Sequence, residues 1–328
     1  MMVDDHGKMN VMNSMVNPDE TPHGGDHPKV VTMPHISVCV CTFKRPVMLQ
    51  RLLEKLSEQD TGGLFTFSIV IVDNDRAESA RSVVERFASG SSLPITYVLE
   101  PRQNIALARN KAVENASGEF IAFIDDDEFP IADWLRSLVS ICEQYGVAGV
   151  LGPVKPHFEH DPPAWVRRGR FYERPSHHTG YQLSMWEART GNVLFRRAIL
   201  DGISVPFRME FGTAGEDIDF FRRMMANGNI FIWCDEAMVF EVVPPERCTR
   251  KYLVRKALLR GSNFLKHPTD RAKNFTKSVV AVPLYAMILP LMFLTGDHHF
   301  VKTLVKFCDH AGRLLAVIRL NPVTERDH

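Results

Sequence analysis

The sequence predicts an α/β protein built on a doubly wound, mainly parallel β-sheet. From residue 35 onward, short apolar runs typical of β-strands alternate with stretches of amphipathic, helical period. Alternation at this spacing is typical of parallel strands joined by crossover helices. The chain has 328 residues, 45% of them hydrophobic and 24% charged, which is enough for one large domain or two smaller ones with a real core.

The first half of the chain carries the clearest pattern. Strands are expected at residues 36–42, 67–73, 95–99 and 120–124, and helices at residues 46–56, 78–87, 104–113 and from residue 132. The second half predicts strands at residues 145–152, 189–195, 229–233 and 238–243, and a helix from residue 216. Residues 153–186 lie between them, rich in Pro, His and aromatic residues and poor in periodicity, as in binding loops or lids.

Composition excludes some classes of partner. Lys and Arg total 39, as do Asp and Glu, so the overall charge gives no reason to expect a nucleic-acid partner. The six cysteines are scattered without a Cys-x-x-Cys pair, which indicates a reducing, cytoplasmic setting. No His-Glu-x-x-His motif occurs, and the histidines are expected to be surface residues and not metal ligands.

The most informative stretch is an apolar strand that ends in three consecutive aspartates. Phe120–Ile124 is followed directly by Asp125, Asp126 and Asp127. Unpaired carboxylates are too costly to bury, so they should lie where the strand emerges, at its carboxyl end. Ligands bind at that edge of open α/β sheets, and clustered carboxylates suit Mg²⁺ or Mn²⁺. On this stretch alone, an acidic turn that caps the next helix explains the pattern at least as well.

Polar residues follow two further strands at the same position. Thr42 and Arg45 follow the first strand, and Asp73 and Asp75 follow the second, so three strand ends can converge on one crevice. Arg109 lies on the helix before the acidic strand, where it either reaches phosphate or is an ordinary solvated arginine. Neither a Gly-x-Gly-x-x-Gly nor a phosphate-loop motif follows any strand, so metal and side chains should handle phosphate.

A second acidic centre lies at Glu216 and Asp217, after a flexible Gly-Thr-Ala-Gly run and at the start of a helix expected to bury Ile218, Phe221 and Met225. Acidic residues in a first turn are stabilised by the helix dipole, which explains them without any function. The functional alternative is a general base presented at the helix N-terminus.

The last part of the chain is basic and apolar. Ten Lys and Arg residues lie between residues 247 and 277, opposed only by Asp270. Residues 279–294 then contain no charge, and residues 301–320 form an amphipathic basic helix. Such a pattern indicates attachment to an anionic membrane surface, either spanning or lying on it; the alternative is a C-terminal helix packed on the domain.

Five ordered motifs resemble those of family 2 glycosyltransferases with the GT-A fold. They begin at residues 36, 70, 104, 123 and 215. Residues 151–154, 189–192 and 243–247 are more specifically similar to the ExoM-type succinoglycan β-1,4-glucosyltransferases. The resemblance covers roughly residues 35–265 and implies a GT-A catalytic domain at residues 34–246, with a nucleotide-binding half at residues 34–128 and an acceptor-binding half at residues 129–246. A disordered leader (1–33) and a helical membrane-associating region (247–328) flank it.

The resemblance also implies roles for these residues. Thr42, Arg45, Asp73, Asp75, Arg109, Asp125 and Asp126 would bind the nucleotide-sugar donor, with Asp127 and Asp125 as ligands of Mn²⁺ or Mg²⁺. Asp217, with Glu216 beside it, would be the catalytic base. Three aspartates in a row leave open which two form the Asp-x-Asp pair. The Gln-x-x-Arg-Trp motif of processive members is absent, which favours addition of one sugar.

The implied activity is that of an inverting hexosyltransferase in exopolysaccharide or surface polysaccharide biosynthesis. It would move glucose from UDP-glucose to a lipid-linked saccharide at the cytoplasmic face of the bacterial inner membrane. Two alternatives remain. A sugar-nucleotide nucleotidyltransferase should show a Gly-rich loop after the first strand, where residues 42–46 stand instead. A non-catalytic nucleotide-sugar-binding membrane adaptor would have no need of Asp217.

Overall fold

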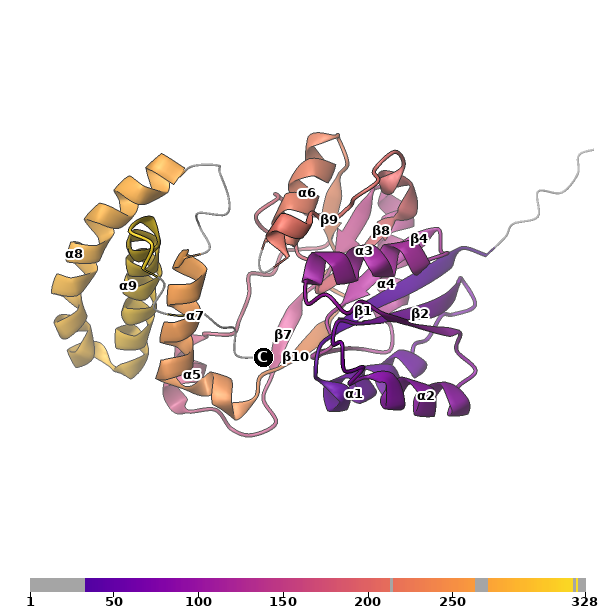
Figure 1. Cartoon of the computed structure of the whole chain (residues 1–328), viewed down its shortest axis with the longest axis horizontal. Coiled ribbons are helices and arrows are strands. Elements are labelled where there is room, and N and C mark those ends of the chain that lie inside the picture. Colours follow the sequence, from indigo (N-terminus) through magenta and orange to yellow (C-terminus); the bar gives the residue numbers. More distant parts are fainter. Residues whose placement is uncertain (1–32, 213–214, 263–270, 321–322, 324–328) are drawn as a thin grey trace, which may run out of the picture. The chain divides into compact units, whose positions relative to one another are not determined.

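The computed structural model describes residues 33–212, 215–262, 271–320 and 323. The expected disordered leader, apart from Met33, lies outside the described residues. From His35 onward the chain forms the predicted mixed α/β fold (Figure 1).

A seven-stranded sheet is the centre of the fold. Its order is β3 (Ile95–Leu99), β2 (Thr66–Asp73), β1 (His35–Thr42), β4 (Phe120–Ile124), β8 (Asn192–Arg196), β6 (Gly149–Leu151) and β9 (Phe231–Trp233). Adjacent strands are parallel, except that β8 runs antiparallel to both β4 and β6. The sheet is therefore mainly parallel, as predicted, and β1 lies between β2 and β4 with the carboxyl ends of all three at one edge.

Alternating residues of the strands pack into two hydrophobic layers, one on each face of the sheet. Val38 and Val40 of β1 belong to the layer that contains residues of α1 (Pro46–Ser57), α2 (Arg81–Gly90) and α4 (Trp134–Tyr145). Cys39, between them, belongs to the other layer, with residues of α3 (Ile105–Asn115) and α6 (Glu216–Ala226). This alternation follows from the period of two in a strand.

A second, three-stranded sheet continues from the acidic stretch. Its order is β5 (Glu128–Pro130), β10 (Val239–Val242) and β7 (Val154–His157), with β10 antiparallel to β5 and parallel to β7. Sequence periodicity did not predict β5 or β7, because runs of three or four residues carry too little pattern. Asp125, Asp126 and Asp127 therefore join two strands, and they do not form the first turn of a helix.

The remaining boundaries differ from the predictions by a few residues. The strand expected at 145–152 is only β6, because α4 extends to Tyr145 and Gly146 ends it in the left-handed conformation. Helix α6 buries Phe221, as predicted, together with Phe220 and Met224, whereas the predicted Ile218 and Met225 are only half-buried. The irregular segment 153–186 includes α5 (Ala164–Gly169) as well as β7, and short 3₁₀ turns occur at Arg197–Leu200, Met209–Phe211 and Pro245–Cys248.

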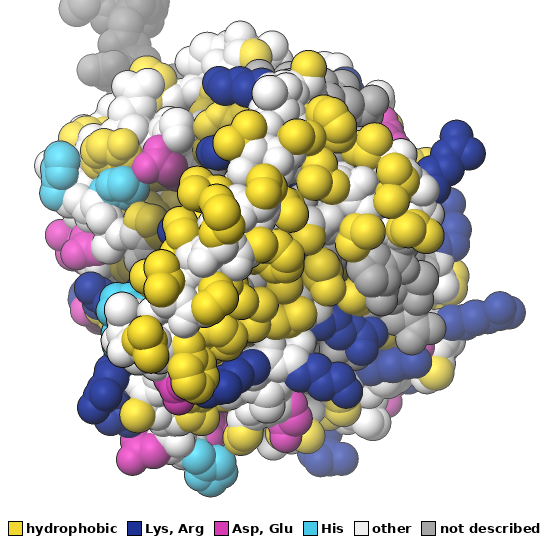
Figure 2. Space-filling view, turned by 90° about the vertical axis from the view of Figure 1, so that its left-hand side faces the viewer, with side chains coloured by type: hydrophobic (Ala, Val, Ile, Leu, Met, Phe, Trp, Pro, Cys, Tyr) yellow, Lys and Arg dark blue, Asp and Glu magenta, His cyan; other side chains and the backbone are white. Residues whose placement is uncertain are grey.

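Three helices follow the two sheets: α7 (Arg250–Ser262), α8 (Arg271–Thr295) and α9 (Asp297–Val317). Helix α8 contains Ala272–Thr295, the one segment of the described chain that is long and apolar enough to cross a membrane, and only 6% of its most apolar window is buried. Large apolar side chains cover the face of the molecule on which α8 lies (Figure 2).

Candidate functional site

The carboxyl ends of β1, β2 and β4 bring the predicted polar residues together. Thr42 at the end of β1 pairs in register with Asp73 at the end of β2. The Thr42 hydroxyl donates a 2.8 Å hydrogen bond to Asp126, just beyond β4. Three segments distant in sequence thus meet at one edge of the sheet, where open α/β folds bind ligands.

Asp126 is held by the protein through both carboxylate oxygens. Thr42 donates to Oδ2, and Arg45 Nη1 donates to Oδ1 at 2.8 Å. Burial raises the pKa of Asp126 and the Asp127 carboxylate raises it further, whereas Arg45 opposes both effects. Only 5% of Asp126 is exposed. The Asp126 side chain therefore links the end of β4 to the end of β1.

Asp127 lies between two arginines. Its Oδ2 is 3.0 Å from Arg45 Nη1 and 3.2 Å from Arg247 Nη2, and Arg247 also contacts Glu241 at 3.3 Å. Arg247 comes from the 3₁₀ turn that leads into α7. In such an arrangement the guanidinium groups can bind a diphosphate and the carboxylate between them can bind its cation.

Asp125 is the most open of the three aspartates. Its side chain is 48% exposed, and its Oδ1 lies 3.6 Å from Arg109, which also forms an ion pair with Glu216. Desolvation by the surrounding protein raises the pKa of Asp125 to about 6; Arg109 opposes this shift, and the Asp127 and Asp126 carboxylates add to it. Arg109 is 6% exposed, so it is an interior ion-pairing residue and not a solvated helix arginine.

Glu128 and Gly191 complete the acidic side of the site. Glu128 is 2% exposed, and its Oε2 accepts a 3.2 Å bond from the Asp125 amide. Burial, followed by the Asp125 and Asp127 carboxylates, raises the pKa of Glu128 well above its usual value. A Cβ at Gly191 would lie 2.8 Å from Glu128 and 3.1 Å from Asp125, so any larger residue would have to displace these carboxylates.

Asp73 and Asp75 shape the loop after β2. Asp73 is fully buried, and its carboxylate accepts bonds from the amides of Asp75 and Ala80 and from the Tyr97 hydroxyl, at 2.8–3.0 Å. Asp75 is 6% exposed and accepts from the amide of Ala77. The Asp73 carboxylate thus accepts three hydrogen bonds from the protein, which fix the loop after β2.

The three acids in the first turn of α6 have different environments. Glu216 is 6% exposed and forms an ion pair with Arg109, while its second oxygen is buried without a partner among the described residues. Asp219 is 1% exposed and accepts from Arg222 and Arg223 at 2.8 and 2.9 Å. Asp217 is half-buried, and within the described chain its carboxylate accepts only from the neighbouring Ile218 amide. Asp217 is therefore the one acid of this turn that is not committed to an ion pair.

A pocket of about 100 Å³ lies next to the acidic residues. Its lining includes the exposed Trp186, the buried Trp233, Arg174, Arg189 and Asn192, the last being adjacent to Gly191. Burial, together with Arg174, lowers the pKa of Arg189, and Asp217 acts in the opposite direction. Aromatic and guanidinium groups beside the acidic residues suit a sugar ring.

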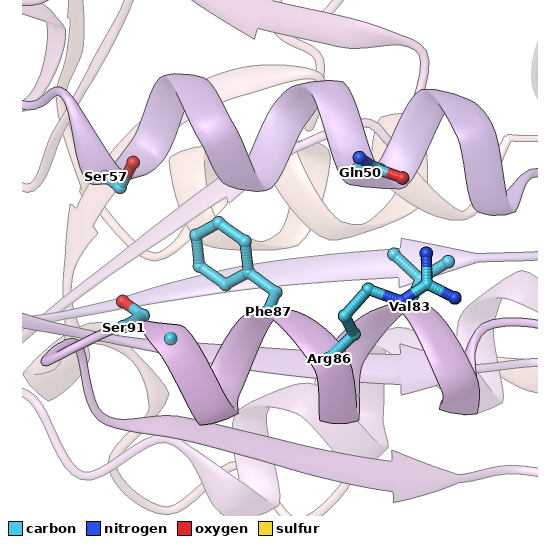
Figure 3. A pocket seen from close by; sticks show the side chains of 7 residues that line it. Gln50, Ser57, Val83, Arg86, Phe87 and Ser91 are labelled. Atoms are coloured by element: carbon cyan, nitrogen blue, oxygen red, sulfur yellow. The ribbon is translucent and has the colours of Figure 1, made fainter.

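A larger hollow of about 310 Å³ lies elsewhere, between α1 and α2. Gln50 and Ser57 line it from α1, and Phe87 and Arg86 from α2 (Figure 3). None of its lining residues belongs to the strand-end group, so it has no part in the site.

The acidic residues fit a hard divalent cation. Among the described residues, no three His, Cys, Asp or Glu side chains form a ready metal-binding group. Mg²⁺-type sites commonly use only one or two carboxylates and complete their coordination with substrate phosphates. Burial is the main cause of the raised pKa values of Asp125 and Glu128, and repulsion from neighbouring carboxylates adds to it in both. An added cation would relieve that repulsion.

Sequence reasoning missed three residues of this site. Arg247 was noted only as part of a basic run, although its partner Asp127 is 120 positions away. Glu128 was taken as the end of the acidic stretch, and Asn74 was not assigned a role. Asn74 bonds to the carbonyls of Glu100 and Arg102 and thereby fixes the loop after β3. Glu128 and Asn74 each immediately flank a predicted ligand, and that position was the missed signal; Arg247 has no such neighbour in the sequence.

Comparison with known proteins identifies the family. The model for glycosyl transferase family 2 matches residues 37–203, about half of the 328-residue chain, from β1 through β8. The chain belongs to glycosyl transferase family 2. The predicted resemblance is thereby confirmed, and the class of activity is glycosyl transfer.

Curated relatives of this family 2 chain extend the match. Succinoglycan biosynthesis protein ExoM of Rhizobium meliloti (strain 1021) is 36% identical over 234 residues, which cover 69% of this chain and 73% of ExoM. The GalNAc(5)-diNAcBac-PP-undecaprenol beta-1,3-glucosyltransferase of Campylobacter jejuni is 31% identical over 122 residues, covering 37% of this chain and 38% of that enzyme.

Solved structures confirm the GT-A fold of this family 2 member. Mannosyltransferase PcManGT from Pyrobaculum calidifontis, solved with GDP-Man and Mn²⁺, has a TM-score of 0.59 at 19% identity and covers 88% of this chain and 87% of its own. S. aureus TarS 1-349 in complex with UDP has a TM-score of 0.51 at 18% identity, covering 87% and 91%. The chain spans 55% of the longer TarS structure.

Proposed function

We propose that this glycosyltransferase adds a single hexose from a nucleotide-sugar to a lipid-linked oligosaccharide during bacterial exopolysaccharide or surface polysaccharide biosynthesis. The observation that carries the proposal is the meeting of Thr42, Asp126 and Asp127 at the strand ends, beside the start of α6 with its uncommitted Asp217. The ExoM relative supports the polysaccharide pathway, and the undecaprenol-linked name of the Campylobacter relative supports a lipid-linked acceptor. UDP-glucose is the proposed donor, from the resemblance to ExoM-type enzymes.

The donor's nucleotide would occupy the edge formed by β1, β2 and the start of α3. Asp73 and Asp75 fix the loop that borders the base, and Arg45 and Arg109 provide fixed positive charge for the diphosphate. Both arginines bridge to aspartates, so a bound diphosphate would compete with those carboxylates for the same guanidinium groups. Thr42 contributes by holding Asp126 in place.

Asp127 and Asp125 would hold a Mn²⁺ or Mg²⁺ ion together with the diphosphate. Such an ion acts as a Lewis acid that stabilises the charge of the departing nucleoside diphosphate. The protein's own part is to present two carboxylates from one short turn between β4 and β5, with Asp126 fixed between them by Thr42 and Arg45.

Asp217 would accept the proton of the attacking acceptor hydroxyl. With the base on the acceptor side and the diphosphate leaving on the other, a single displacement inverts the anomeric centre. The pocket at Trp186 and Arg189 lies in the half of the chain assigned to the acceptor, and Arg189 is close enough to Asp217 for their charges to interact. An acceptor sugar in this pocket would therefore lie between the base and the donor carboxylates.

The proposed organisation has a GT-A catalytic domain at residues 34–246 and a membrane-associating region at residues 247–328. Residues 34–128 would bind the donor, and residues 129–246 the acceptor. The apolar helix α8 and its basic neighbours support attachment to the cytoplasmic face of the inner membrane, where a lipid-linked acceptor is presented.

A panel of nucleotide-sugars tests the function directly. Purified protein is incubated with each donor and Mn²⁺, with Mg²⁺ or with a chelator, and release of nucleoside diphosphate is measured. We expect cation-dependent hydrolysis of one hexose donor, and transfer when a polyprenyl-diphosphate saccharide is added. Release of inorganic diphosphate from a nucleoside triphosphate and a sugar phosphate would identify a nucleotidyltransferase. Donor binding without any turnover, in wild type and in Asp217→Asn alike, would identify an adaptor.

A further inference from the structure

Helix α8 carries an apolar stripe that the protein leaves uncovered. Val280, Leu284, Met287, Leu291 and Leu294 recur every three or four residues, and their exposed fractions run from 47% to 83%. We call these five residues the α8 stripe. Figure 2 shows a broad hydrophobic field on the side of the molecule where α8 lies. Exposed apolar surface of this extent marks a binding surface.

The opposite face of α8 is packed against α9, and the two helices run antiparallel. Near the start of α8, buried Ser278 is 2.9 Å from His310, which also stacks on Tyr285 with ring centroids 5.8 Å apart. Near its end, Phe293 packs on Phe300 at 5.7 Å. The contact therefore continues from one end of α8 to the other.

Helix α9 is in turn packed against α7, with both helices running in the same direction. Arg250 pairs with Asp297 at 3.0 Å, and Arg260 pairs with Asp309 at 2.8 Å. Gly261 and Gly312 let the two backbones approach closely, since a Cβ on either would meet the backbone of the other helix. The helices α7, α9 and α8 thus form one layer, with α9 in the middle (Figure 1).

The packing of this layer argues against a spanning arrangement for α8. At 1.5 Å per residue, the 25 residues of α8 are about 37 Å long, which is enough to cross a bilayer. If α8 crossed, α9 and α7 would have to lie beside it within the hydrocarbon. Both carry charges along their length, including Lys302, Lys306 and Arg313 on α9. Charged side chains at that depth are strongly unfavourable.

We propose that α8 lies in the plane of one leaflet, with the α8 stripe buried among the lipid chains and α9 covering its protein side. This inference rests on the proposed function for its choice of a membrane as the partner. The segment would thus be monotopic: both of its ends stay on the same side of the bilayer.

Charge around α8 favours an anionic lipid surface over another protein as the occupant. Lys273 and Lys277 precede the stripe on α8, and Lys302 and Lys306 follow it on α9, all four exposed. In Figure 2, Lys and Arg side chains border the apolar field. An apolar stripe with a basic border matches the acyl chains and anionic headgroups of one leaflet.

The arrangement also connects the membrane layer to the catalytic site. Arg247, which contacts Asp127, is three residues before Arg250, the first residue of α7 and the partner of Asp297. A connection this short fixes the distance between the Asp127 carboxylate and the layer formed by α7 and α9. An acceptor whose lipid is embedded in the same leaflet would meet the site without leaving the membrane.

Labelling from one side of the membrane distinguishes the two arrangements. Single reporters Lys273→Cys and Thr295→Cys, at the two ends of α8, are placed in full-length protein in sealed, cytoplasm-out vesicles and treated with an impermeant maleimide. Wild-type protein gives the background from the six native cysteines, all buried or half-buried. We expect both reporters to be labelled without detergent. Labelling of one only, with the other requiring detergent, would show that α8 spans and overturn the proposal.

Vesicle binding tests the α8 stripe itself. A quadruple variant with Leu284→Gln, Met287→Gln, Leu291→Gln and Leu294→Gln should partition onto phosphatidylglycerol-containing vesicles on the order of 10⁴-fold more weakly than wild type, since each of the four inserted apolar side chains contributes roughly a factor of ten. The matched control Leu64→Gln with Ile230→Gln changes side chains that are exposed on the catalytic part and should bind like wild type.

Two readouts separate this proposal from its competitors. Donor hydrolysis in water should be equal in the quadruple variant and wild type, because the α8 stripe does not touch the proposed catalytic residues. If wild type itself hydrolyses no donor, the proposed function is wrong, whereas the vesicle-binding result still tests the α8 stripe. Equal vesicle binding by the variant and wild type would refute the membrane role of the stripe. A wild-type dimer in lipid-free buffer that the variant loses would show that a second copy covers the stripe instead.

Discussion

Replacing Asp217 by Asn should abolish most of the catalysis while leaving the fold intact. In the first turn of α6, Glu216 is bound to Arg109 and Asp219 to Arg222 and Arg223, whereas Asp217 has no ion pair among the described residues. An amide of the same size keeps the local packing but cannot accept a proton. We expect the rate of transfer to fall about 10²- to 10⁴-fold, which is about 2.7–5.5 kcal/mol of activation free energy.

The neighbouring acids provide matched controls with the opposite expectation. Asp219 is 1% exposed, and although burial alone raises the pKa of its carboxyl, the bonds from Arg222 and Arg223 hold that pKa below its usual value. Asp219→Asn removes the charge that these arginines share and should lower the free energy of unfolding by about 2–4 kcal/mol. Asp217→Asn should change it by no more than about 0.5 kcal/mol.

The assay combines three measurements on each variant. Transfer to a polyprenyl-linked acceptor gives the rate, calorimetric titration with UDP-sugar and Mn²⁺ gives donor binding, and urea unfolding gives stability. If Asp217→Asn binds donor normally and still transfers sugar near the wild-type rate, Asp217 is not the base. If it loses stability as Asp219→Asn does, the acid is structural and the reasoning from its missing ion pair fails.

Three further predictions follow from the contacts of other residues. Gly191→Ala places a methyl group 2.8 Å from Glu128 and should displace its carboxylate. We expect the rate of Mn²⁺-dependent donor hydrolysis to fall about tenfold and the free energy of unfolding to fall by about 1–3 kcal/mol. Unchanged hydrolysis would contradict this prediction. Arg247→Ala removes one of the two guanidinium groups on Asp127 and should lower the unfolding free energy by about 1–3 kcal/mol, measured in urea, whereas Arg247→Lys should recover part of it. Burial, and to a lesser extent the charge of Arg313, holds the pKa of His310 below its ordinary value of 6.5, so the folded state binds this proton less readily than the unfolded state. The free energy of unfolding of the wild type should therefore fall as the pH drops below about 6.5. The variant His310→Gln should lose this part of the pH dependence.

Much of the fold was predictable because strand and helix periods are local properties. The strands ending at Thr42, Asp73 and Ile124 are long enough for their apolar runs to be clear, and each is followed by a recognisable helix or turn. The antiparallel direction of β8 was not predictable. Direction depends on how the chain returns through residues 153–186, where side chains pack on distant segments and leave no period in the sequence.

The site was predictable to the extent that it lies at strand ends. Topology alone brings Thr42 to Asp126, since neighbouring parallel strands end at one edge. Arg247 was not predictable in this way, because its contact with Asp127 requires the 3₁₀ turn after β10 to fold back over the sheet edge. Partners of this kind depend on tertiary packing that no spacing in the sequence encodes.

The division of labour among the three aspartates follows from which oxygens the protein has already used. Both oxygens of Asp126 are bonded, one to Thr42 and one to Arg45, and the side chain is 6% exposed, so a cation would have to break two short bonds to reach it. Asp125 is 48% exposed, and the only ion-pair contact of its carboxylate among the described residues is the longer one to Arg109. Asp127 offers an oxygen beyond the one its arginines share. We therefore propose Asp125 and Asp127 as the pair that would bind the cation, while the bonds from Thr42 and Arg45 to Asp126 hold the turn against β1.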